Sequence, residues 1–266
     1  GTLIQRGINY KEVPLSINGS PDYENIAKTV GKNTRMVLIQ RSKGYTLRPS
    51  LTIPEMADLI EMIRNKAPQA VIFVDNCYGE FTDTLEPSHL GADIMAGSLI
   101  KNPGGGLAAS GGYIVGRAEL IQEVAYHLTA PGLGKELGAS LTNPRLLYQG
   151  LFLAPHVVAQ ALKGASLLAY IMEQFSYEVM PRWYEARGDI VQAIKLNSAE
   201  EVLKFCQIIQ SCSPVDSDVN LEYARMPGYS DSVVMAAGTF VQGSSIELSC
   251  DAPLREPYCV FLQGGL

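Results

Sequence analysis

Two short apolar runs on either side of an amphipathic segment constrain the fold of this chain more than any other feature of its sequence. The runs are Met36–Gln40 and Ala70–Asp75, and both are typical of parallel strands that are buried on both faces. Between them, Thr52–Glu55 has the pattern of a capping box with proline in the first turn, which predicts the start of a helix. A strand, a helix and a strand at this spacing predict a right-handed parallel crossover in an α/β layer.

The alternation continues along the chain. Further strands are predicted at Asp93–Gly97 and Gly112–Gly116, a helix at Ala118–Leu128, and a long apolar helix at about residues 143–174, bent at Pro155. Beyond this helix, strands are predicted at Asp189–Lys195, Val233–Ala237 and Ser244–Cys250, with a helix at residues 199–210. We therefore expect a mostly parallel α/β domain over residues 1–175 and a smaller α+β domain over residues 176–266.

Composition argues against several classes of function. The formal charge of -6 is spread along the 266 residues without a basic run, so nucleic acid and anionic membranes are poor partners. Five cysteines without a CxxC pair fit a reducing cytoplasm better than a disulfide scaffold. Three dispersed histidines give no support for a metal site, and no apolar run reaches the length of about 18 residues that a membrane span needs.

An aspartate and a lysine carry the chemical signal. Asp75 lies at the carboxyl end of an apolar strand, where open α/β sheets place ligand-binding groups, and Lys101 follows the next strand. Such a carboxylate can pair with a protonated pyridine nitrogen, while the amine forms a Schiff base with an aldehyde on the same ring. Burial should lower the pKa of this lysine and favour the neutral amine. The Ser98 hydroxyl can donate to a phosphate, and the glycines at 104–106 let the backbone pass close to a ligand.

Each of these residues also has an ordinary structural interpretation. Asp75 can cap the next turn, Lys101 can be solvated, Ser98 can bond to the backbone, and the three glycines can form a loop without a ligand. Their order, on these elements, favours a cofactor site.

Several longer stretches resemble a known family. The chain is similar to fold-type I enzymes that use pyridoxal 5'-phosphate (PLP), within the Cys/Met-metabolism group, and most closely to the methionine γ-lyase/cystathionine β-lyase-related aluminium resistance proteins. The matching stretches span nearly the whole chain: Val37–Ser42, Arg48–Leu51, Phe73–Phe81, Ala96–Gly106, Leu128–Gly132, Tyr148–His156, Ser213–Asp216 and Ala237–Gln242.

The resemblance implies roles for individual residues. Lys101 would hold PLP as a Schiff base and then move the α-proton of the substrate, and Asp75 would pair with the pyridinium nitrogen. Ser98 would bind the phosphate, and Asn76 and Tyr78 would contact the cofactor. Arg255 would clamp the substrate carboxylate, with Arg41 and Arg48 as rivals and a surface position as the alternative.

The resemblance also implies a whole activity, namely β- or γ-elimination from sulfur-containing amino acids by a homodimer or homotetramer. Family members have a further segment before the position of Gly1, and a turn in that segment would bind the cofactor phosphate. Two alternatives remain open. One is other PLP chemistry, such as transamination or racemisation, and the other is a non-catalytic fragment that binds a phosphate ligand.

Overall fold

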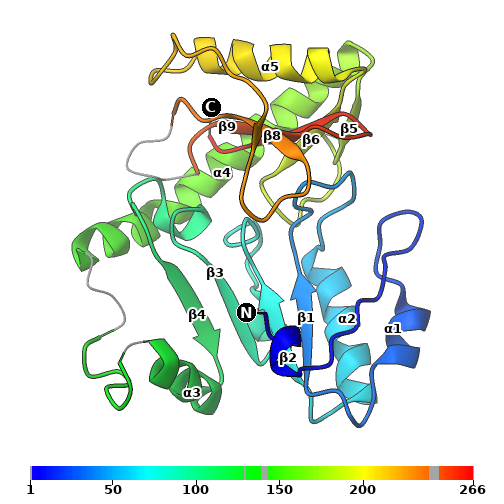
Figure 1. Ribbon diagram of the computed structural model, residues 1–266, viewed down its shortest axis with the longest axis vertical. Helices are drawn as coiled ribbons and strands as arrows, with labels where there is room; N and C mark the ends of the chain where they lie inside the picture. The colour runs from blue at the N-terminus through cyan, green and yellow to red at the C-terminus, as the bar shows by residue number, and fades with distance from the viewer. Residues whose placement is uncertain (1, 129, 139–142, 240–245, 266) are drawn as a thin grey trace.

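The computed structural model places two sheets one above the other, with a long helix running beside the upper one (Figure 1). It describes residues 2–128, 130–138, 143–239 and 246–265. The helices are α1 (Tyr23–Thr29), α2 (Ile53–Lys66), α3 (Ala118–Leu128), α4 (Pro144–Gln174) and α5 (Ala199–Ser211), with short 3-10 helices η1 (Ile4–Arg6), η2 (Pro87–Leu90) and η3 (Asn102–Gly104). The strands are β1 (Met36–Gln40), β2 (Val71–Asp75), β3 (Ile94–Ser98), β4 (Gly112–Gly116), β5 (Glu178–Met180), β6 (Gln192–Lys195), β7 (Ala224–Arg225), β8 (Ser232–Ala236), β9 (Ser249–Pro253) and β10 (Cys259–Gln263).

The lower sheet has the order β1-β2-β3-β4. The first three strands are parallel, as expected, and β4 closes the sheet as an antiparallel strand. The predicted capping box is present, since the backbone N–H of Thr52 donates to Glu55 Oε2 at 2.8 Å. Burial of Met56 and Ile60 on α2 against Ile72 on β2 then fixes this helix on one face of the sheet.

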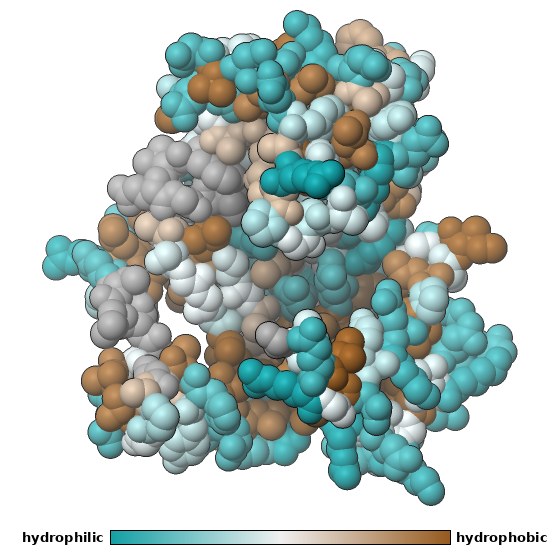
Figure 2. Space-filling view, in the orientation of Figure 1, coloured by the Kyte–Doolittle hydropathy of each residue, from teal (hydrophilic) through white to brown (hydrophobic). Residues whose placement is uncertain are grey.

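The opposite face of the lower sheet carries exposed apolar side chains. Successive side chains of a strand alternate between faces, so Met36 and Leu38 on β1 point away from Ile39, which packs under α2. Both are more than half exposed, and Figure 2 shows hydrophobic side chains at the surface in this part of the molecule. Strand register places Asp75 on the same face, because it lies opposite Gln40 on β1.

Helix α4 joins the two sheets. It continues through Pro155, and its buried residues are mostly small, which allows neighbouring backbone to approach closely. A Cβ atom on Gly105, whose φ is +53°, would lie 2.3 Å from the carbonyl oxygen of Gly150. Gly105, one of the three glycines expected to pass near a ligand, thus allows η3 to pack closely against α4. By length and hydropathy alone, α4 could cross a membrane. One such helix is weak evidence for a membrane span, and the small residues of α4 pack against η3 and β6.

The upper sheet is antiparallel, with the order β5-β6-β10-β9-β8-β7, and α5 covers one face. The predicted strand at Asp189–Lys195 begins later, at Gln192, because Asp189 is used in an ion pair. The strand predicted at Ser244–Cys250 was wrong in its position: the observed strand begins at Ser249, and residues 244 and 245 lie outside the described ranges. The short strands β5 and β7 and the buried strand β10 had not been predicted.

A buried ion pair ties the loop after β1 to the segment before β6. Lys43 Nζ lies 2.8 Å from Asp189 Oδ1, and both side chains are fully buried. The Ser42 hydroxyl donates to Asp189 Oδ2 at 2.7 Å, and Lys43 Nζ also donates to the Val191 carbonyl at 2.8 Å. Burial by itself raises the pKa of Asp189, but the charge and hydrogen bonds of Lys43 outweigh it and hold that pKa below its usual value.

We expect Asp189→Asn to lower the free energy of unfolding at pH 7 by about 3–5 kcal/mol, because Lys43 is left buried without a counter-ion. Since folding lowers the pKa of Asp189, the parent should lose this advantage as the pH falls through the pKa of the folded carboxyl. Urea unfolding at several pH values measures both effects. Glu178→Gln, which breaks the exposed pair with Lys195, is the control and should change little. Equal losses for the two variants at pH 7 would contradict the assignment.

Candidate functional site

The carboxyl ends of β2 and β3 bring the predicted cofactor residues to one edge of the lower sheet. The strands are parallel neighbours, and Asp75 at the end of β2 lies opposite Ala96 on β3. Lys101 follows β3 by three residues, and Asp75 is one of the charges that act on it. The structure thus places the acid and the amine in one cluster, as the position of both after parallel strands predicted.

The amine of Lys101 lies over an aromatic ring. Its Nζ atom is 4.1 Å from the ring centroid of Tyr78, a residue in the left-handed backbone region with φ +68°. Burial by itself lowers the pKa of Lys101, but Tyr78, Cys77 and Asp75 together outweigh it, so the pKa is raised above its usual value. The expectation of a lowered pKa for this lysine was therefore wrong.

Asp75 and Ser98 keep simple local contacts. Asp75 Oδ1 accepts a hydrogen bond of 3.1 Å from the backbone N–H of Cys77, and the side chain is partly exposed. Ser98 ends β3 opposite Gly112, and its carbonyl lies 3.4 Å from the backbone nitrogen of Lys101. Ser98 is three residues from Lys101 along the chain, and the pairing of β2 with β3 brings Asp75 near it, so both can serve the same ligand; their proposed roles stay predictions.

Asn76 is held by protein groups. Its side chain is fully buried, its Oδ1 accepts from Arg41 Nη1 at 2.9 Å, and its Nδ2 donates to Glu86 Oε2 at 2.9 Å and to Tyr113 Oη at 3.2 Å. These bonds orient the turn after β2. A cofactor contact through Asn76 stays a prediction, and its observed bonds also engage Arg41, one of the rival carboxylate clamps.

Glu80 is a site residue that the sequence did not point to. It is buried, its Oε1 accepts from the Tyr113 hydroxyl at 2.7 Å, and its Oε2 has no hydrogen-bond partner among the described residues. Burial raises the pKa of Glu80 to about 7, while the Lys101 charge acts in the opposite direction. A Cβ atom at Gly97 would lie 2.2 Å from Glu80 Oε1, so glycine on β3 makes room for this carboxyl.

Arg255 lies in the loop between β9 and β10. Its Nη1 pairs with Asp231 Oδ2 at 2.9 Å, and its Nη2 donates to the Tyr45 carbonyl at 2.7 Å. The hydroxyl of Tyr45 in turn donates to Asp251 Oδ2 at 3.0 Å. Arg48, the other rival clamp, donates to the carbonyls of Ser42 and Pro49. Arg255 is thus exposed, as the alternative of a surface position has it, and is linked through Tyr45 to the buried Asp251 of the upper sheet.

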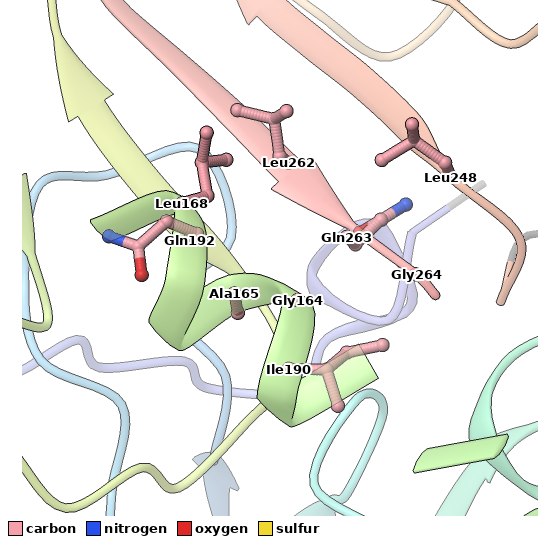
Figure 3. A pocket seen from close by; sticks show the side chains of 9 residues that line it. All are labelled: Gly164, Ala165, Leu168, Ile190, Gln192, Leu248, Leu262, Gln263 and Gly264. Carbon is pink, nitrogen blue, oxygen red and sulfur yellow. The ribbon is translucent and has the colours of Figure 1, made fainter. Parts of the chain in front are cut away.

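A hollow between α4 and the upper sheet differs in character from the Lys101 cluster (Figure 3). Its lining is mostly apolar or small, with Leu168, Ile190 and Leu262 around it and Gln263 at one end. It offers packing space rather than convergent polar groups. Within the described ranges, no group of three or more His, Cys, Asp or Glu side chains could hold a metal ion.

Comparisons with known proteins place these residues in a family. The profile of the methionine gamma-lyase family matches residues 1–266. The uncharacterized protein YnbB of Bacillus subtilis is 49% identical over the whole chain, which spans 63% of its length. An L-methionine gamma-lyase of Treponema denticola is 26% identical over 137 residues, which are 51% of this chain and 33% of that protein.

Solved structures agree with this match. A Listeria monocytogenes protein, proposed to be a cystathionine beta-lyase involved in aluminum resistance, is 50% identical with a TM-score of 0.94; all of this chain matches 66% of that one. A Clostridium novyi carbon-sulfur lyase involved in aluminum resistance is 49% identical with a TM-score of 0.91, over all of this chain and 62% of its own. The chain therefore spans about two thirds of the length of these relatives.

We expect Glu80→Gln to change how stability depends on pH. Folding raises the pKa of Glu80 to about 7. The folded parent should therefore be most stable at pH values below the pKa that Glu80 has in the unfolded chain, and its free energy of unfolding should fall as the pH rises through 7. Between pH 5 and 8 the variant should gain about 2 kcal/mol relative to the parent. Urea unfolding at both pH values measures this, and Glu61→Gln on the exposed face of α2 is the control. A difference between parent and Glu80→Gln that does not change with pH would refute the raised pKa.

Proposed function

The chain belongs to the methionine γ-lyase family, and from that membership we propose that it acts as a PLP-dependent carbon-sulfur lyase on sulfur-containing amino acids, by β- or γ-elimination. Relatives that share half of its sequence include a carbon-sulfur lyase, which supports a lyase activity. The observation that carries the proposal is the placement of Lys101 and Asp75 at one sheet edge, with the lysine amine over the Tyr78 ring.

The residues present fit a pyridoxal phosphate group. Lys101 offers a partly buried primary amine, Asp75 a carboxylate for the ring nitrogen, and Ser98 a hydroxyl for the phosphate. Glu80 Oε2 nearby has no partner among the described residues, which is consistent with a polar group that completes the site. When bound, pyridoxal phosphate supplies an electron sink that stabilises negative charge at the α-carbon of an amino acid.

Lys101 can handle a proton at its Nζ atom. The raised pKa means that this amine holds its proton in the free protein, so it must release that proton before it can act as a nucleophile. Its neighbours include Asp75 and Tyr78, and its charge also reaches Glu80. When substrate has displaced this amine from the cofactor, the amine is the group placed to take the α-proton of the substrate and to donate it to another atom of the same substrate.

Arg255 is the proposed clamp for the substrate carboxylate. A guanidinium offers two parallel donors, which match the two oxygens of a carboxylate. In the observed state these donors are used by Asp231 and by the Tyr45 carbonyl. Substrate would therefore replace at least one of these contacts, and the exposed position of Arg255 permits that exchange.

We further propose that the protein works in the cytoplasm as a homodimer or homotetramer. Large apolar side chains at the surface of α4 support an oligomer, among them Phe152, which is 84% exposed. The described cysteines are free thiols, which suits a reducing compartment.

Reduction with borohydride in the presence of pyridoxal phosphate tests the cofactor assignment. We expect one labelled peptide, the one that contains Lys101, and we expect Lys101→Ala to lose at least about 90% of the label because the reacting amine is gone. Lys163→Ala on the exposed side of α4 is the matched control and should keep it. Peptide mass mapping gives the readout. If Lys101→Ala were labelled as fully as the parent, the site would be elsewhere.

The products distinguish the reaction types. With L-cystathionine, L-methionine or L-cysteine, elimination releases ammonia and a keto acid from one substrate, whereas transamination needs a keto-acid acceptor and releases no ammonia. Racemisation gives neither set of products and is detected as the D-amino acid, so labelled protein that forms none of these products would favour the non-catalytic alternative.

A further inference from the structure

Glu80 packs the turn after β2 against strands β3 and β4. It is only 3% exposed, and its Oε1 accepts from the Tyr113 hydroxyl of β4 at 2.7 Å. A Cβ atom at Gly97 of β3 would lie 2.2 Å from the same oxygen, so the glycine leaves room for the carboxyl. The carboxyl is thus held against the strand that leads to Lys101.

The segment that contains Lys101 is tied to the same residue. The side chain of Asn102 is fully buried, and its Nδ2 donates to the Glu80 carbonyl at 2.9 Å. Tyr78, whose ring centroid lies 4.1 Å from Lys101 Nζ, precedes Glu80 by two residues. Glu80 is therefore linked to both members of this contact, to the ring along the chain and to the amine through Asn102.

The carboxyl of Glu80 has no cation of its own. In the part of the chain that the structure describes, no Lys, Arg or His side chain forms an ion pair with it, and its Oε2 has no hydrogen-bond partner. The charge of Arg41 acts on it, but Arg41 pairs with Glu86, with Nη1 3.5 Å from Oε2. Because a buried charge without a partner is costly, this carboxyl ionises at a higher pH than an exposed one.

We propose that Glu80 is a positioning residue that controls the charge of Lys101. In its neutral form it leaves the amine easier to deprotonate, and in its ionised form it holds the amine as an ammonium. This inference rests on the proposed function, because Lys101 is the amine assigned to the cofactor. It adds a dependence of that amine on pH, which is set by a carboxyl in the adjoining turn.

The groups around Glu80 give the sign and the range of this effect. Burial raises the pKa of Glu80 to about 7; Glu86 adds to the rise, while Tyr113 and Lys101 oppose it. As Glu80 ionises through pH 7, its negative charge favours the ammonium form of Lys101. The pKa of Lys101 should therefore rise with pH over this range, and the two groups titrate as a coupled pair.

Three other groups that act with Lys101 change their charge mainly outside this range. Burial raises the pKa values of the Cys77 thiol and the Tyr78 hydroxyl above their ordinary values of 9.0 and 10.0. Burial raises the pKa of Asp251 to about 6, below the midpoint of Glu80. Glu80 therefore changes its charge more than these three groups between about pH 6.5 and about pH 8.5.

Competitive acetylation of the free chain with acetic anhydride, read by peptide mass spectrometry, measures the effect without any cofactor. Lys163, exposed on α4, is the internal reference. Two amines that titrate independently, well below their pKa values, gain reactivity in parallel, so the ratio of Lys101 to Lys163 labelling would be constant. In the parent we expect this ratio to fall about 3-fold from about pH 6.5 to about pH 8.5, and in Glu80→Gln to change by less than about 1.5-fold.

Glu61→Gln, on the exposed face of α2, is the matched control and should show the same fall as the parent. A constant ratio in the parent, or an equal fall in Glu80→Gln, overturns the role of Glu80. Circular dichroism shows whether Glu80→Gln is folded. If it is not, Tyr113→Phe gives the decisive measurement. Loss of the hydroxyl that lowers the pKa of Glu80 should move the midpoint of the fall up by about one pH unit, and an unchanged midpoint rejects the role.

Borohydride labelling of Lys101 with pyridoxal phosphate separates this inference from the proposed function. Label on Lys101 together with a constant acetylation ratio refutes the role of Glu80 alone. A fall in the ratio that depends on Glu80, without label on Lys101, refutes the cofactor assignment alone.

Discussion

The ion pair between Lys43 and Asp189 is the contact on which the arrangement of the two sheets depends. It joins residues 146 positions apart, and each Asp189 oxygen has protein donors, so the pair meets the condition under which buried charges are tolerated. The next residue, Ile190, donates its backbone N–H to the Tyr78 carbonyl at 3.2 Å. Because the Lys101 amine lies over the Tyr78 ring, this hydrogen bond between the two parts of the chain also helps to position the ring beneath the proposed catalytic amine.

Local patterns predicted the lower sheet well and the upper sheet poorly. Strand β4 and helix α3 have the bounds that periodicity indicated, because their signals lie within the segments themselves. Strand β10 is different: its five residues are all buried, so no alternation marks it, and it lies between the nearby strand β9 and the strand β6, which is far away in the sequence. Asp189 misled the prediction of β6 for a similar reason, since the partner that makes it a loop residue is in another part of the chain.

Some residues of the candidate site could likewise be predicted from the sequence, and others could not. Asp75 and Lys101 could be placed together from sequence, because parallel strands end at one edge of a sheet. Glu80, Asp251 and the direction of the pKa shift at Lys101 could not, since they depend on which side chains meet across the turn after β2 and across the two sheets. Gly105 shows what a glycine in a sequence does not predict. We expected the backbone to pass close to another group here, but the sequence does not tell whether that group is a ligand or, as observed, the backbone of Gly150.

The electrostatics of the site form one coupled system rather than a set of separate residues. The Lys101 charge lowers the pKa values of both Glu80 and Asp251, and burial raises both of them to near neutrality. Any bond that removes the charge of Lys101 therefore also removes a force that keeps these two acids ionised. Either the acids then take up protons or a cation enters beside them. A lysine held among buried acids thus links its own covalent state to the protonation of its surroundings, and that link follows from geometry rather than from any single residue.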